Sequence, residues 1–263
     1  MRNFTYYAPT KIVFGKETEK ETGALIREQG CERALIVYGS GSVKRSGLLE
    51  RISASLEDAG VSHVELGGVV PNPRLSKVRE GIELCRREKA DFLLSVGGGS
   101  VIDTAKAISY GVPYAGDVWD FFAGKAAAQA ALPMGCVLTI AAAGSEMSNS
   151  SVITNEEMHE KSAILDDALF PVLAIVDPEL MVSVSPKFTA YQGFDALFHS
   201  VEAYIAGTAN LMSDMFALAA IENVSRYLTR AVRDGKDLEA REHVAFGNYA
   251  SGFVMCVGSC ASE

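Results

Sequence analysis

The sequence lacks any run of about 18 apolar residues, the length that a helix needs to cross a bilayer. It also lacks the continuous apolar segment that a secretory signal peptide carries near its N-terminus. Positive charge is scarcer than negative charge: the formal net charge is −9 and the isoelectric point is about 5.1. This balance argues against nucleic acid or an anionic membrane as the main partner. We therefore expect neither a membrane nor a nucleic-acid partner.

Cysteines are few, scattered and odd in number: the chain has five, Cys31, Cys85, Cys136, Cys256 and Cys260. Such a set suits reduced thiols better than a disulfide framework. Cys256 and Cys260 lie four residues apart in a helical pattern, and we interpret them as small core residues rather than metal ligands. The expected location is the cytoplasm.

Hydrophobic residues make up 48% of the 263 residues and charged ones 22%, as is typical of a soluble globular protein. In most of the chain, short apolar patterns alternate with longer helical ones. The predicted strands are 11–15, 33–38, 64–70, 92–96, 134–140 and 172–176, and the predicted helices include 48–56 and 75–90. This alternation predicts βαβ units around a Rossmann-like parallel sheet.

After Pro186 the pattern changes. Three long helical patterns, 188–205, 213–231 and 238–257, follow with no strand between them. We therefore predict an α/β domain at 1–185 and the start of an all-helical domain at 186–263. The last pattern reaches the end of the chain without a cap or a glycine stop, which indicates that the helical domain is incomplete.

A glycine turn follows the apolar strand 92–96. The run Gly97-Gly-Gly99 lets the backbone turn sharply and approach a ligand closely. Ser100 is a good N-cap for the helix that follows, and Asp103 completes a variant capping box. A helix N-terminus after such a turn is an anion site, which here predicts a bound phosphate. On this stretch alone, a turn that only serves tight packing remains an alternative.

A second turn, Tyr38-Gly-Ser-Gly-Ser-Val-Lys-Arg45, follows an earlier strand. Folds that bind NAD usually place an acidic residue here, where it bonds the 2′-hydroxyl of the adenosine ribose. No acidic residue lies between Val37 and Gly47, whereas Lys44 and Arg45 can receive a 2′-phosphate. The turn therefore favours NADP(H) over NAD(H). A plain turn with a solvated basic pair is the alternative.

Asp195 and His199 are four residues apart in the first of the three helical patterns, so their side chains share one face. A carboxylate oxygen and an imidazole nitrogen in this arrangement can hold a divalent metal; a hydrogen bond between them is the alternative. We interpret the other histidines, His63, His159 and His243, as residues that bind no metal.

These stretches together resemble the iron-containing alcohol dehydrogenases, and most closely their NADPH-preferring butanol dehydrogenase and aldehyde reductase branch. The motifs that carry the resemblance occur in the family's order along the whole chain. They are Pro9-Thr-Lys-Ile-Val-Phe-Gly15, Tyr38-Gly-Ser-Gly-Ser-Val-Lys44, Gly68-Val-Val-Pro-Asn-Pro73, Gly97-Gly-Gly-Ser-Val-Ile-Asp-Thr-Ala-Lys106, Gly116-Asp-Val-Trp-Asp-Phe-Phe122, Gly144-Ser-Glu-Met147, Val152-Ile-Thr154, Asp177-Pro-Glu-Leu180 and Asp195-Ala-Leu-Phe-His199. So many motifs in one order make the resemblance specific.

The resemblance implies a dehydroquinate synthase-like architecture, in which 1–185 bind the dinucleotide and 186–263 begin the metal-binding domain. It also implies a set of cofactor contacts. These are Gly39, Ser40 and Ser42 on the adenosine side, Gly98, Gly99 and Ser100 at the pyrophosphate, Asn72, Thr139, Lys161 and Met181 along the remainder, with Asp103 counted among the cofactor residues.

For the metal, the resemblance implies Fe²⁺, sometimes replaced by Zn²⁺, with Asp195 and His199 as its first two ligands. The family takes two further histidines from later positions, and this chain ends at Glu263 before them. Two of the four expected ligands are therefore absent from the chain.

The implied activity is metal-dependent hydride transfer between NAD(P)(H) and a primary alcohol or aldehyde, with a cytoplasmic homodimer as the expected assembly. Two alternatives remain open. One is an inactive nucleotide-binding fragment. The other is a related enzyme of similar architecture, such as a glycerol dehydrogenase or a sugar-phosphate cyclase.

Overall fold

The computed structural model describes residues 3–258 and divides into two compact units. The α/β unit comprises Thr10–Leu138 and Asn149–Val176. The helical unit comprises Thr139–Ser148 together with the described parts of Met1–Pro9 and Asp177–Glu263. The side chain of Cys256 and the whole of Cys260, which we interpreted as core residues, lie outside the described residues.

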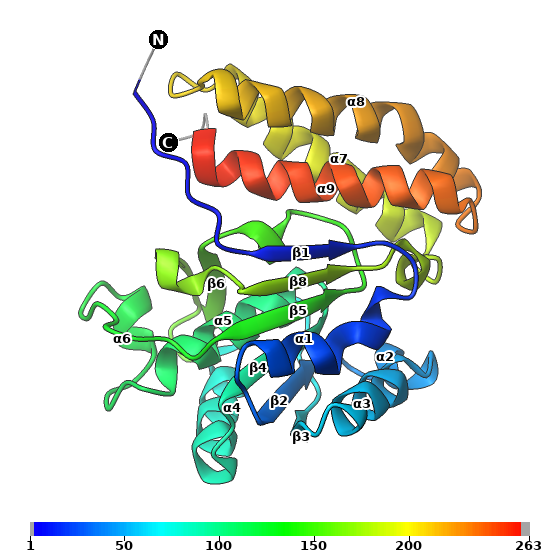
Figure 1. Ribbon diagram of the computed structural model, residues 1–263. Helices are drawn as coiled ribbons and strands as arrows, with labels where there is room; N and C mark the ends of the chain where they lie inside the picture. Colours follow the sequence, from blue (N-terminus) through cyan, green and yellow to red (C-terminus); the bar gives the residue numbers. More distant parts are fainter. Residues whose placement is uncertain (1–2, 259–263) are drawn as a thin grey trace. The chain divides into compact units, whose positions relative to one another are not determined.

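A six-stranded parallel sheet forms the centre of the α/β unit, with the strand order β1-β8-β5-β4-β2-β3 (Figure 1). Its strands are β1 (Lys11–Phe14), β2 (Arg33–Tyr38), β3 (Ser62–Leu66), β4 (Phe92–Gly97), β5 (Met134–Leu138) and β8 (Leu173–Val176). Every residue of β4, β5 and β8 is buried, as expected of central strands covered on both faces. The predicted parallel α/β fold is confirmed.

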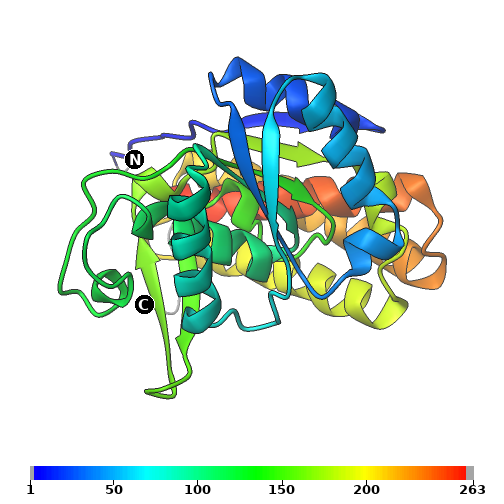
Figure 2. The same cartoon turned by 90° about the horizontal axis from the view of Figure 1, so that it is seen from below.

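Helices cover both faces of this sheet. They are α1 (Thr22–Glu28), α2 (Ser42–Arg45), α3 (Leu48–Asp58), α4 (Leu75–Glu88), α5 (Gly99–Gly111) and α6 (Trp119–Phe122). Figure 2 shows α1 and α3 on one face and α4 and α5 on the other. This arrangement follows from right-handed crossovers between parallel strands, because the direction of the crossover reverses at β3.

An antiparallel hairpin, β6 (Ser150–Asn155) and β7 (Glu160–Leu165), extends the α/β unit beyond its sheet (Figure 2). It is fixed to α5, because Lys106 Nζ donates to Ser150 O at 2.9 Å and Ser151 Oγ donates to Asp103 O at 2.9 Å. The hairpin was not predicted. Burial alternates along β6, but the residues that alternate are largely polar, so the strand signal in the sequence is weak.

The helical unit contains α7 (Pro186–Ile205), α8 (Leu211–Arg233) and α9 (Leu238–Gly258), at the three predicted patterns. Ser185 caps α7, and Asn210 and Ser213 form a capping box at α8. Small buried residues, Ala203 and Ala217 with Val254, let the three helices pack closely. The predicted helical region is thereby confirmed. No helix among the described residues is long and apolar enough to cross a membrane.

Candidate cofactor and metal sites

The glycine turn lies between β4 and α5, as predicted. β4 ends at Gly97, and α5 begins at Gly99 with Gly98 as its N-cap. The backbone N–H groups of Val101 and Ile102 donate to Gly98 O at 2.9 and 3.1 Å. The prediction of Ser100 as N-cap is wrong, since no side chain caps this helix and Ser100 lies within its first turn.

Asp103 does not complete a capping box either. Its Oδ2 accepts from Val152 N at 3.2 Å, so the carboxylate connects α5 to the hairpin. Gly98 is the N-cap without a side-chain hydrogen bond, and glycine is one of the residues favoured at that position.

The space around the turn fits a phosphate group. A Cβ at Gly97 would lie 2.6 Å from Val101 Cγ2, so this glycine lets the helix approach the strand. A Cβ at Gly99 would meet no atom within 4 Å. The N-terminus of the 13-residue helix α5 therefore has open space beside its free N–H groups, where the helix dipole favours an anion.

The second turn, with Gly39, Ser40 and Ser42, follows β2 and leads into the short helix α2. The turn itself carries no acidic residue, but the neighbouring strand β3 supplies one. Lys44 Nζ lies 3.1 Å from Glu65 Oε2, and Tyr38 OH donates to the same oxygen at 2.9 Å. Lys44 thus forms an ion pair with Glu65, a residue that sequence reasoning missed.

Hydrogen bonding keeps this small network ionised. Burial acts to raise the pKa of Glu65, but the hydrogen bonds from Tyr38 and Lys44 outweigh it and hold the pKa below its usual value. The hydrogen bonds with Tyr38 and Glu65 raise the pKa of Lys44. Glu65 pairs with Ile36 of β2, two residues before Tyr38, and this register cannot be read from the local sequence.

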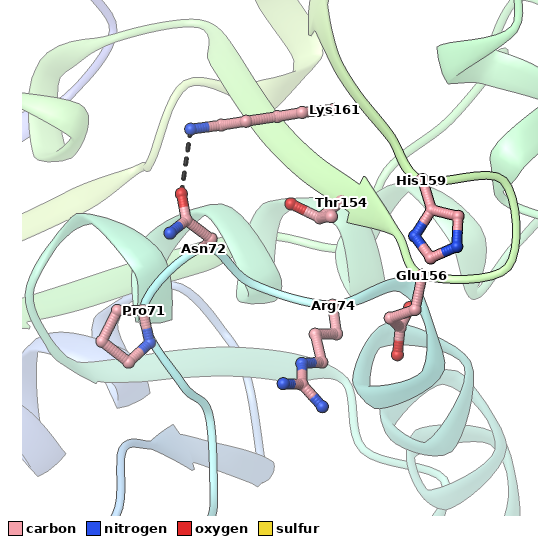
Figure 3. Close-up of a pocket in the computed structure, with 7 residues that line it drawn as sticks. All are labelled: Pro71, Asn72, Arg74, Thr154, Glu156, His159 and Lys161. Atoms are coloured by element: carbon pink, nitrogen blue, oxygen red, sulfur yellow. Dashed lines mark hydrogen bonds between the residues drawn. The ribbon is translucent and has the colours of Figure 1, made fainter.

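A pocket of about 620 Å³ lies between the hairpin and the loop that precedes α4 (Figure 3). Asn72 and Lys161, 89 residues apart, meet in it, with Lys161 Nζ donating to Asn72 Oδ1 at 3.0 Å. Its lining residues are Pro71, Asn72, Arg74, Thr154, Glu156, His159 and Lys161. The structure thus brings together two predicted cofactor residues and adds Thr154, which sequence reasoning assigned no role.

Thr139 and Met181 belong to the helical unit. Thr139 is half-buried at the start of the segment Thr139–Ser148, whereas the Met181 side chain is only 2% exposed. As positioned here, Met181 is a core residue.

The segment Thr139–Ser148 is held firmly against α9. Gly144 N donates to Asn248 Oδ1 at 3.0 Å, and Asn248 Nδ2 donates to Glu146 Oε1 at 2.7 Å; both side chains are about 1% exposed. A Cβ at Gly144 would lie 2.3 Å from Gly252 Cα, so the two backbones touch where both residues are glycine. This contact fixes the Gly144-Ser-Glu-Met147 motif.

Asp195 and His199 project from the same face of α7. Asp195 Oδ1 lies 3.6 Å from His199 Nε2, and His199 Nδ1 is buried with no hydrogen-bond partner among the described residues. A carboxylate oxygen and an imidazole nitrogen at this separation fit two ligands of one divalent cation. Within the described residues, no group of three His, Cys, Asp or Glu side chains is placed to hold a metal ion.

His243 is engaged elsewhere. Its ring stacks on Tyr227 with centroids 3.7 Å apart, and its Nδ1 lies 2.6 Å from Asn223 Oδ1. This agrees with its interpretation as a residue that binds no metal.

Comparison with known proteins adds two family matches and several close relatives. Residues 9–178 match the iron-containing alcohol dehydrogenases, and residues 189–261 match the C-terminal region of the same family. The probable NADH-dependent butanol dehydrogenase 2 of Bacillus subtilis is 43% identical over 94% of this chain. The NADH-dependent butanol dehydrogenase A of Clostridium acetobutylicum is 37% identical, also over 94% of this chain.

A solved structure has the same fold. The crystal structure of NADH-dependent butanol dehydrogenase A from Thermotoga maritima superposes with a TM-score of 0.94 and 40% identity over 98% of this chain. The chain spans 63% of the Bacillus relative, 64% of the Clostridium relative and 65% of the Thermotoga chain. Both the α/β fold and the helical region are therefore shared with these proteins, and the chain belongs to the iron-containing alcohol dehydrogenase family.

Proposed function

We propose that this chain binds a nicotinamide dinucleotide and takes part in hydride transfer between that cofactor and a primary alcohol or aldehyde. Its similarity to proteins named butanol dehydrogenases supports a short-chain alcohol as the substrate. The observation that carries the proposal is the open N-terminus of α5, where Gly99 leaves room for a phosphate beside free N–H groups.

Most of the predicted site residues have a part in this proposal; Thr139 and the buried Met181 have none. Gly98, Gly99 and Ser100 present backbone N–H groups to the pyrophosphate. The turn at Gly39, Ser40 and Ser42 receives the adenosine side, and Asn72 and Lys161 bind polar groups further along the cofactor. Asp103 acts indirectly, since its bond to Val152 holds the hairpin that carries Lys161.

Asp195 and His199 would hold a divalent cation, Fe²⁺ or in its place Zn²⁺. When bound, such a cation supplies Lewis-acid chemistry toward an alcohol or carbonyl oxygen, while the dinucleotide supplies or accepts the hydride. We assign cofactor binding to the domain predicted at 1–185 and metal binding to the domain that begins at residue 186. A cytoplasmic homodimer remains our expectation for location and assembly.

The turn after β2 supports NADP(H) as the preferred cofactor. It carries no carboxylate that would repel a 2′-phosphate. Two observations weigh against a strong preference: Glu65 shares the charge of Lys44, and the Bacillus and Clostridium relatives are named NADH-dependent. We therefore propose a modest preference for NADP(H).

Fluorescence titration with NADPH and NADH, followed by an assay of butanol oxidation with added Fe²⁺ or Zn²⁺, tests the proposal. Saturable binding of either dinucleotide supports it, and absence of binding contradicts it. A second candidate, nucleotide binding without turnover, is favoured by one observation: Asp195 and His199 have no third metal-binding partner among the described residues. Binding with no turnover at saturating metal would support this candidate, whereas turnover would exclude it.

A further inference from the structure

A second cavity lies at the end of α5 that is remote from the glycine turn. Its volume is about 350 Å³, and it is formed by the C-terminal end of α5, by α6 and by the loop that leads from α6 toward β5. Sites for small molecules usually have volumes of about 300–1,000 Å³. Tyr110, which lines the cavity, lies roughly 16 Å from Gly99 along the helix axis, at about 1.5 Å per residue. The cavity is therefore separate from the proposed phosphate site.

A cluster of aromatic rings lines this cavity. The Phe121 ring contacts both tyrosines of the lining, with its centroid 4.6 Å from that of Tyr110 and 4.6 Å from that of Tyr114. Gly116 helps to place one of the rings, because a Cβ there would lie only 2.6 Å from Tyr114 Cε1. The motif Gly116-Asp-Val-Trp-Asp-Phe-Phe122, which the proposed function does not use, thus supplies one ring and makes room for another.

Each tyrosine hydroxyl donates to a carboxylate. Tyr110 OH donates to Asp166 Oδ2 at 2.5 Å, and Tyr114 OH donates to Asp120 Oδ2 at 3.2 Å. Burial, followed by these hydrogen bonds, raises the pKa of both phenols, so the two rings remain neutral. Within the described residues, neither carboxylate forms an ion pair with a basic side chain. Two negative charges therefore lie one hydroxyl group away from the rings.

Positive charge near the cavity does not offset these carboxylates. Among the described residues, none that lines the cavity is charged. Arg86 lies at the same end of α5, where it donates to Gly111 O at 2.9 Å and to Val112 O at 3.0 Å. Those carbonyls form the negative end of the helix dipole, and they take up the charge of the guanidinium. Lys125 is exposed and does not line the cavity. The charge around the aromatic cluster is therefore negative on balance.

We propose that this cavity binds a small organic cation that carries a quaternary ammonium group. Aromatic rings attract such a cation electrostatically, and the cation requires no hydrogen-bond acceptor. A phenol that donates to a carboxylate is polarised toward negative charge, which strengthens the attraction. A metal ion would instead require several oxygen ligands, whereas this lining is mostly aromatic and aliphatic. The site goes beyond the proposed function and does not depend on it.

Acetylcholine and neohexyl acetate, its uncharged carbon isostere, separate the effect of charge from that of shape. In calorimetric titrations we expect the wild-type chain to bind acetylcholine at least roughly 5-fold more tightly than the neutral ester, through the attraction between cation and rings. Tyr114→Leu should remove most of this advantage, because leucine keeps the lining apolar but has no ring. Tyr114→Phe keeps the ring and should retain most of the advantage.

Asp120→Asn tests the charge behind the rings and should lower the affinity for acetylcholine by roughly 2- to 5-fold. Asp58→Asn, the same change at an exposed residue at the end of α3, is the matched control and should have no effect. Affinity for NADPH should stay the same in every variant. Equal affinity of the wild type for the two esters, no binding of acetylcholine, or an equal loss in Asp58→Asn overturns the inference. If Tyr114→Leu does not fold, the two esters and the aspartate variants still decide.

Discussion

The ammonium of Lys44 and the carboxylate of Glu65 lie 3.1 Å apart, on the turn after β2 and on the neighbouring strand β3. Lys44 is one of the two residues, with Arg45, that the sequence offers for a 2′-phosphate, and Glu65 competes with the phosphate for Lys44. The pair therefore bears directly on which dinucleotide the chain prefers.

Removing the Glu65 carboxylate should strengthen the preference for NADPH. In Glu65→Gln, we expect the affinity for NADPH to rise by about 2- to 5-fold, because an exposed ion pair has an energy of this order. NADH affinity should change little, and the gain should shrink as salt is added. Titration of both dinucleotides with Glu65→Gln and with Glu50→Gln, an exposed substitution of equal charge, measures this. An equal gain in the control would show that only net charge matters.

Placing a carboxylate on the turn itself should reverse the preference. A Cβ at Gly39 would have only Val69 O nearby, at 3.5 Å, and the glycine has no left-handed φ, so Gly39→Asp fits without strain. The new carboxylate should weaken NADPH binding by roughly 10-fold or more through like-charge repulsion, and it can accept from the 2′-hydroxyl of NADH. Gly39→Ala separates charge from bulk. An unchanged ratio of affinities in Gly39→Asp would place the adenosine ribose elsewhere.

The metal ligands should be separable from cofactor binding. Asp195→Ala and His199→Ala should each weaken Zn²⁺ binding by at least the roughly 10- to 100-fold that is typical of losing an outer-shell partner. Dinucleotide affinity should be retained, because the cofactor residues of the glycine turn belong to the other unit. His243→Ala serves as the control, since Tyr227 and Asn223 hold that ring. Titration with Zn²⁺ gives the readout; weaker Zn²⁺ binding in His243→Ala alone would assign the site to a different helix.

The close contact between Gly144 and Gly252 should make any side chain at position 252 destabilising. Alanine is preferred over glycine inside a helix by about 1 kcal/mol. In Gly252→Ala, however, the Cβ would lie 2.3 Å from Gly144 O, and overpacking of this kind costs about 3 kcal/mol. We expect a net loss of about 2 kcal/mol in chemical denaturation. Gly207→Ala, where a Cβ meets no atom within 4 Å, should be close to neutral. A Gly252→Ala variant that is more stable than the wild type would mean that the backbone at Gly144 moves to accommodate the new Cβ, and it would contradict this prediction.

Local patterns predicted most of the secondary structure. β2 and β4 could be predicted from their contiguous apolar residues. The three long helices could be predicted from the 3.6-residue period of their apolar residues. The predicted start of α5 was wrong, because Ser100, directly after the glycine run, looks like an N-cap. In the structure Gly98 is the N-cap, and no side chain caps the helix. β6 was missed since its alternation involves serine, threonine and asparagine rather than clearly apolar residues.

The parts of the candidate site that were missed depend on tertiary structure. Glu65 reaches Lys44 only through the pairing of β2 with β3, and Thr154 faces Lys161 only through the hairpin register. The family resemblance gave Asn72 and Lys161 each as a cofactor contact, whereas their meeting and their hydrogen bond required the fold. The grouping of Thr139–Ser148 with the helical unit, through Asn248 and Gly252, has no signal in the local sequence.

The central claim is that a dinucleotide phosphate lies at the N-terminus of α5, and Gly99→Ala tests it most directly. The Cβ would occupy space that is open in the folded chain, so the unfolding midpoint and the circular dichroism should match those of the wild type. The affinity for NADPH and for NADH, measured by fluorescence titration, should fall by at least roughly 10-fold, or about 1.4 kcal/mol. Gly207→Ala should bind as the wild type does. Wild-type affinity in a normally folded Gly99→Ala chain would contradict the account.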